Sequence, residues 1–149
     1  MRPVVALSFA MSLTALTLAG CSKPKPLYVD AAWVRLNAVA TGPAAAYFDV
    51  HGGPAPAMLI SVATDTAIRT EMHQSGTDGQ MATMTPLASV DIPARTLVRF
   101  APGGRHVMLS NVNPEIKRGG AMTFTFTFAD GQRIEQSATV IAAGDPAPK

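Results

Sequence analysis

The sequence is poor in cysteine, in charge and in helical patterning. Its 149 residues include one cysteine, 12 basic residues and 10 acidic residues. No cluster of lysines and arginines and no RNA-binding motif is present, so we do not expect nucleic acid as a partner. No Ser-His-Asp motif, phosphate-binding loop, dinucleotide fingerprint or carboxylate-rich metal cluster occurs either, so we expect that the protein is not an enzyme.

The first twenty residues have the composition of an export signal. An apolar run from 4 to 18 is too short for a comfortable membrane span. It ends in Leu18-Ala19-Gly20-Cys21, the pattern of a lipoprotein signal, in which the cysteine is acylated and becomes the new amino terminus. We therefore predict a signal peptide over residues 1–20 and a lipid anchor at Cys21. Ser22 follows, where an aspartate would indicate the inner membrane, so we expect a periplasmic protein in the outer membrane.

Acylation of Cys21 would consume the one thiol of the chain. Disulfide formation, thiol nucleophilic catalysis and thiolate binding to a metal are then excluded. The Lys-Pro-Lys-Pro stretch that follows cannot continue a helix, so residues 21–26 are expected to form the anchor and a short stiff tether. The rest of the chain is long enough for one domain, which we expect over 27–143, followed by a flexible tail at 144–149.

Short alternating runs bounded by glycine, proline, aspartate and asparagine recur along the chain, and this pattern is typical of an all-β Greek-key sandwich or barrel. In the clearest run, 122–128, methionine and phenylalanine occupy one face and threonine the other. Asp130-Gly131 then predicts a hairpin turn into 133–141. Trp33 is expected to anchor the core. Further strands are expected at 28–36, 44–50, 58–62, 66–72, 81–85, 90–92, 97–100 and 106–109.

Two histidines and two methionines form the register His-x10-Met-x21-His-x-Met, at His73, Met84, His106 and Met108. Imidazole and thioether donors, without thiolate or carboxylate, suit monovalent copper. His106 and Met108 are two residues apart on an expected strand, so their side chains point to the same face. A two-residue hairpin loop centred on Asp78-Gly79 would place His73 directly opposite Met84. The sequence therefore predicts a Cu(I) site with four neutral donors.

The pairing of His73 with Met84 depends on the length of the loop between them. A longer loop around Ser75-Gly76 would give His73 a different partner. Met72 and Met81 lie beside the proposed loop and are candidates for auxiliary thioether ligands. His51 stands in a His-Gly-Gly-Pro segment and is expected to be a turn residue that does not bind metal.

The same residues resemble the PCuAC-type periplasmic copper(I) chaperones. The match lies in the register described above and in further segments, Ala32-Trp33-Val34-Arg35, Asp78-Gly79-Gln80-Met81 and Pro102-Gly103-Gly104-x-His106-Val107-Met108-Leu109. The resemblance covers nearly all of the mature chain. It implies a cupredoxin-like Greek-key β-sandwich that carries Cu(I) to the dinuclear copper centre of a cytochrome c oxidase, often beside a second, thiol-bearing chaperone. The tail has no histidine- and methionine-rich extension of the kind some relatives carry, so we expect one copper ion, and we expect a monomer.

Two other hypotheses fit the same sequence. In the first, the protein uses the same site to sequester copper for resistance instead of delivering it. In the second, it is a metal-free β-sandwich lipoprotein that binds a protein partner. The second hypothesis predicts no change in thermal stability on adding Cu(I), because only a ligand that binds the folded form raises stability.

Overall fold

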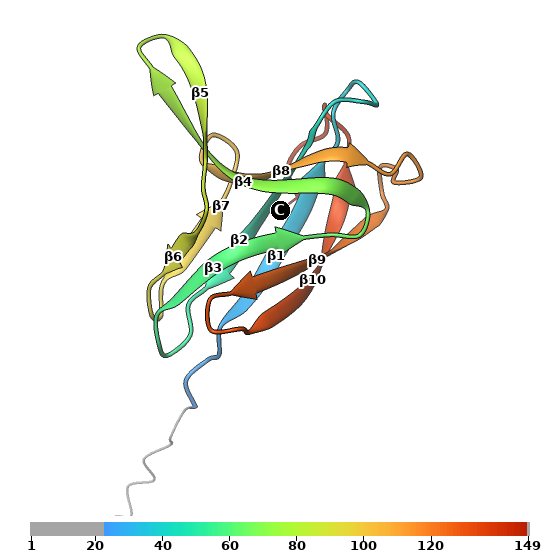
Figure 1. Cartoon of the computed structure of the whole chain (residues 1–149). Helices are drawn as coiled ribbons and strands as arrows, with labels where there is room; N and C mark the ends of the chain where they lie inside the picture. Colours follow the sequence, from blue (N-terminus) through green and yellow to red (C-terminus); the bar gives the residue numbers. More distant parts are fainter. Residues whose placement is uncertain (1–22, 149) are drawn as a thin grey trace, which may run out of the picture.

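The computed structural model describes residues 23–148 and shows an all-β domain (Figure 1). Within these residues no helix is long and apolar enough to cross a membrane. The strands are β1 (Tyr28–Arg35), β2 (Ala44–His51), β3 (Ala57–Ala63), β4 (Ala67–Asp78), β5 (Met81–Pro86), β6 (Val90–Ile92), β7 (Leu97–Phe100), β8 (Arg105–Val112), β9 (Ala121–Phe128) and β10 (Arg133–Ile141). The predicted signal peptide at 1–20, the predicted lipid anchor at Cys21 and Ser22 lie outside the described residues.

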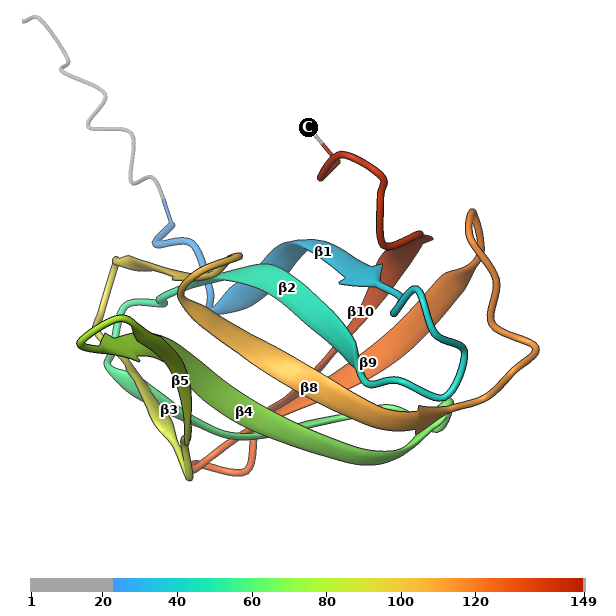
Figure 2. The same ribbon diagram turned by 90° about the horizontal axis from the view of Figure 1, so that it is seen from above.

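All the strands belong to one hydrogen-bonded sheet, which curls over itself into two layers (Figure 2). The strand order is β5-β4-β8-β7-β2-β1-β10-β9-β3-β6, and β2 pairs with β7 along one half and with β8 along the other. Strands β1 and β10 run parallel, and β7 and β8 also meet in parallel, whereas the other neighbouring strands pair antiparallel. The all-β prediction is therefore confirmed.

The hydrophobic core fills the space between the layers. Strand β9 contributes every second side chain of 122–128 to this core, as its alternating sequence predicts. The Phe126 ring meets the Phe48 ring of β2 edge-on with centroids 4.7 Å apart, and Phe48 stacks on Phe100 of β7 at 4.2 Å. The contact between Phe126 and Phe48 joins the two layers, whereas Phe48 and Phe100 are partners on adjacent strands of one layer.

Trp33 lies on the outer face of the sheet, so the prediction that it anchors the core is wrong. Its cross-strand partner on β2 is Tyr47, whose ring is 4.4 Å away and which faces outward between two core residues. The cause is a bulge at Ala31, which has a φ of 49° and shifts the register between Asp30 and Trp33. The tryptophan is nevertheless buried, because Tyr47 and the Arg35 guanidinium, 5.1 Å from its ring centroid, cover it.

The hairpin of β4 and β5 extends as an arm beyond the body of the domain (Figure 1). Its turn is Gly79-Gln80, because Asp78 pairs with Met81 in the ladder. Gly79 has a φ of 61°, the positive φ that a type II′ turn requires at its first central position. Strand β4 therefore continues through residues 73–78, beyond the strand expected at 66–72, and a longer loop around Ser75-Gly76 is excluded.

The C-terminal segment is attached to the domain at Asp145, within the predicted tail at 144–149. Its carboxylate accepts hydrogen bonds from the Ala142 amide at 2.9 Å and from Arg118 Nε at 2.6 Å, and its carbonyl accepts one from Arg35 at 3.2 Å. The Ala142 amide, followed by Arg118, holds the pKa of Asp145 below its ordinary value. Asp145 thus attaches this segment to Arg35 of β1, to Arg118 and to Ala142, the residue after β10.

Candidate metal centre

Strands β4 and β8 bring His73 and His106 together. The two residues are direct partners in the antiparallel ladder, and their ring centroids lie 5.8 Å apart. Direct partners point to the same face of a sheet, and Val107, the next residue along β8, is in the core. Both imidazoles therefore lie on the outer face. This pairing was not predicted, because no turn connects β4 to β8 and no local signal in the sequence sets their register.

Met108 lies on the same face as the two histidines, as its spacing from His106 predicts. It follows His106 by two residues on β8, and its direct partner on β4 is Glu71, two residues before His73. Met108 is partly exposed. The structure thus brings His73, His106 and Met108 together over two neighbouring strands.

The predicted direct pairing of His73 with Met84 is wrong. His73 pairs with Pro86, and Met84 pairs with Ser75, because the turn of the arm is one residue later than the sequence predicts. The later turn shifts the partner of each β4 residue by two positions along β5. Met84 therefore stays on the same face as His73 and becomes its diagonal neighbour. Diagonal neighbours are about 7–8 Å apart, within reach of a long side chain. Met84 is 58% exposed.

Met72 and Met81, the candidate auxiliary ligands, do not reach this face. Met72 lies next to His73 on β4 and therefore points the other way, into the hydrophobic core. Met81 is three residues from Met84 on β5, at the tip of the arm, so it lies on the opposite face of the hairpin. Neither thioether is placed to share an ion with the two histidines.

His106 is oriented by the backbone of the preceding turn. Its Nδ1 lies 3.2 Å from the Gly104 carbonyl and 3.5 Å from the Ser75 hydroxyl. A carbonyl oxygen can only accept, so Nδ1 donates its hydrogen and Nε2 keeps a lone pair. The side chain is 5% exposed, and the Tyr47 ring lies beside it with centroids 6.4 Å apart. Burial raises the pKa of Tyr47, partly offset by Arg35, so this neighbour is a neutral phenol.

His73 has the opposite environment. Both of its ring nitrogens are buried without a hydrogen-bond partner among the described residues. The nearby charged group is Glu71, whose Oε2 is 3.9 Å from His73 Nε2. Buried polar atoms are normally hydrogen-bonded, since leaving one unpaired costs free energy. A metal ion bound on this face, beside the free Nε2 of His106, would give one of the unpaired ring nitrogens of His73 a partner.

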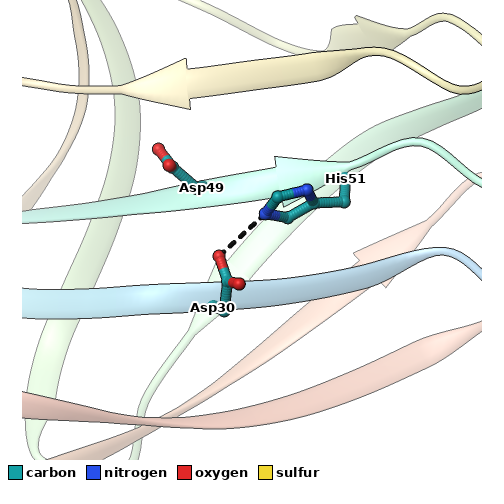
Figure 3. Close-up of side chains that lie close together, drawn as sticks. All are labelled: Asp30, Asp49 and His51. Atoms are coloured by element: carbon teal, nitrogen blue, oxygen red, sulfur yellow. Dashed lines mark hydrogen bonds and ion pairs between the residues drawn. The ribbon is translucent and has the colours of Figure 1, made fainter.

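A second group of potential metal donors is Asp30, Asp49 and His51, on the outer face of β1 and β2 (Figure 3). Here the donors already have partners. His51 Nε2 lies 2.9 Å from Asp30 Oδ1, as Figure 3 shows, and Arg99 Nε lies 3.5 Å from Asp49 Oδ2. The His51 ring also stacks on Tyr28, with centroids 4.1 Å apart. This group is an ion-pair network, in contrast to the unpaired nitrogens of His73.

Comparison with known proteins identifies the family. The family model described as "Putative lipoprotein LpqE-like" matches residues 27–140. The chain belongs to this LpqE-like lipoprotein family. One relative, "Putative lipoprotein Lxx21020" from Leifsonia xyli subsp. xyli (strain CTCB07), is 31% identical over 105 residues. The aligned part is 69% of this chain, and the chain spans 62% of the length of that curated relative.

Solved structures with the same fold are PCuAC domains. The copper-bound PCuAC domain of PmoF2 matches 81% of this LpqE-like chain and 97% of its own length, with a TM-score of 0.66 and 21% identity. Apo-DR1885 from Deinococcus radiodurans matches 97% of this chain and 100% of its own, with a TM-score of 0.60 and 25% identity. The Cu(I) form of DR1885 has a TM-score of 0.56 and 27% identity over 83% of each chain. The predicted cupredoxin-like fold and the resemblance to PCuAC proteins are therefore confirmed.

Proposed function

We propose that this LpqE-like protein is a copper(I) chaperone that binds one Cu(I) through His73, Met84, His106 and Met108. The observation that supports it most is the pair of directly opposed histidines, one with a lone pair left free by its backbone hydrogen bond and one with both nitrogens unpaired. Two imidazoles and two thioethers are neutral donors, and the soft thioethers in particular suit Cu(I). The Cu(I) form of DR1885, with 27% identity and the same fold, is further support.

The unequal exposure of the donors fits a carrier that must also release its ion. His106 is buried and fixed by the backbone, whereas Met84 is exposed on a projecting arm. An acceptor can therefore approach and displace the Met84 thioether first, while the histidines still hold the ion. Four protein donors leave no open position on the metal for a substrate, so the proposed role is transport and not catalysis.

The proposed destination of the ion is the copper-bearing subunit of a cytochrome c oxidase, with a thiol-bearing chaperone as a further partner. We propose that the protein acts in the periplasm, held by a lipid on Cys21 to the outer membrane, which is consistent with its lipoprotein family. Deleting the gene is expected to lower oxidase activity in a way that added copper restores. Copper sensitivity with normal oxidase activity would instead support sequestration.

X-ray absorption of the copper-loaded chain tests the ligand set. We expect one Cu(I) per chain with both nitrogen and sulfur scatterers, because two donors of each type share the face. A His51→Ala variant is the matched control, since His51 is paired with Asp30 and should leave the spectrum and the stoichiometry unchanged. A spectrum without sulfur would contradict the assignment of Met84 and Met108. An absence of any thermal shift with Cu(I) would favour the metal-free hypothesis.

A further inference from the structure

Glu71 lies between the proposed copper ligands without a role in the ligand set. It is the direct partner of Met108 and stands two residues before His73 on β4, so it lies on the same outer face as both. Its two carboxylate oxygens have different neighbours. Oε1 accepts a hydrogen bond from Arg69 at 2.6 Å, and Oε2 lies 3.9 Å from Nε2 of His73.

An imidazole that binds a metal through one nitrogen almost always donates the hydrogen of its other nitrogen to a carboxylate, a carbonyl or water. His106 already has such a partner in the Gly104 carbonyl. His73 has none among the residues of 23–148, since both of its nitrogens are unpaired. Glu71 Oε2 is about 1 Å beyond hydrogen-bond distance, and a small rotation of either side chain would close that gap.

We propose that Glu71 is the positioning residue for His73. When Cu(I) binds, Glu71 Oε2 accepts the hydrogen of His73 Nε2, which fixes the ring with Nδ1 toward the ion. Arg69 holds the other carboxylate oxygen and so keeps Glu71 aimed at His73. The two histidines then use different nitrogens for copper, Nδ1 in His73 and Nε2 in His106. This inference rests on the proposed copper site and adds the tautomer and the partner that the site requires.

Charge favours the same arrangement. Four neutral ligands leave the full positive charge of Cu(I) on a partly buried face, and a carboxylate beside one ligand offsets part of that charge. Arg69 pairs with the same carboxylate, but its side chain is 67% exposed against 36% for Glu71, so water screens the arginine more strongly. If Glu71 served only as the ion-pair partner of Arg69, replacing it would leave the Cu(I) affinity unchanged.

The test compares Cu(I) affinity in Glu71→Gln and the parent chain, both expressed from residue 22 so that every described residue is present. Competition with a Cu(I) chelator should show a loss of about 10–100-fold, the usual effect of removing such a partner. Glu71→Asp, which keeps the charge, should recover part of the affinity. Glu115→Gln, an exposed glutamate in the loop before β9, should behave as the parent chain.

Nitrogen-15 NMR of the imidazoles separates positioning from a general loss of structure. In the copper-loaded parent chain His73 should bind through Nδ1 with a hydrogen on Nε2, and in Glu71→Gln this preference should weaken while His106 is unchanged. Parent-like affinity and an unchanged His73 tautomer in Glu71→Gln would overturn the inference but leave the copper site intact. Failure of the parent chain to bind Cu(I) through His73 would overturn the proposed function itself.

Discussion

Replacing His106 with alanine is expected to lower the Cu(I) affinity by more than about 100-fold. Loss of a partner that only orients a ligand costs about 10–100-fold, and loss of the ligand itself should cost more. His106 is also the most rigid donor of the set, because it is 5% exposed and bound to the Gly104 carbonyl. The remaining donors are the imidazole of His73 and the thioethers of Met84 and Met108, so the ion would keep only three of its four proposed ligands.

Chelator competition measures this loss, with thermal unfolding of the apo form recorded beside it. The apo His106→Ala variant should still unfold cooperatively, because the large core side chains of β9 are not touched by the change. His51→Ala is again the control, as it removes a histidine from a separate ion-pair network. An affinity equal to that of the parent chain would exclude His106 from the site.

Replacing Phe126 with alanine is expected to lower the free energy of unfolding by about 3–5 kcal/mol, the usual cost of removing a buried aromatic ring. Phe126 is completely buried, and its ring contacts Phe48 across the two layers. Since domains of this size are stable by only about 5–15 kcal/mol, the variant should retain a small part of its stability.

Urea unfolding at equilibrium checks this prediction. Thr123→Ala is the matched control, because Thr123 is on the same strand but exposed, and such surface changes usually stay within about 0.5 kcal/mol. A loss below about 1 kcal/mol for Phe126→Ala would show that the contact between the layers contributes less than its burial indicates.

The features that the sequence predicts correctly are local ones. The alternation in 122–128 reports directly which side chains face the core, and the turn at Asp130-Gly131 has a glycine with a φ of 87° where the chain reverses. The spacing of His106 and Met108 likewise predicts a shared face, because both residues lie on one strand.

The features that the sequence does not predict depend on the pairing of distant segments, or on one residue that shifts the register of a strand. The opposition of His73 and His106 follows from the register of β4 with β8, which only tertiary packing sets. In the arm, Gly79 fits a turn centred on either Asp78-Gly79 or Gly79-Gln80, and only the ladder decides for Gly79-Gln80. At Ala31 one extra residue reverses the faces of β1, so a tryptophan expected in the core appears outside it.

The strand order places the four proposed ligands on strands that differ in local stability. Strand β8 has neighbours on both sides, β4 lies next to it, and β5 is the outermost strand, paired with β4 alone among the described strands. Amide hydrogens at a sheet edge exchange through small local openings, whereas central strands open only when the whole domain unfolds. The proposed ion can therefore lose its outermost ligand through fraying of the arm, at a free-energy cost far below that of unfolding.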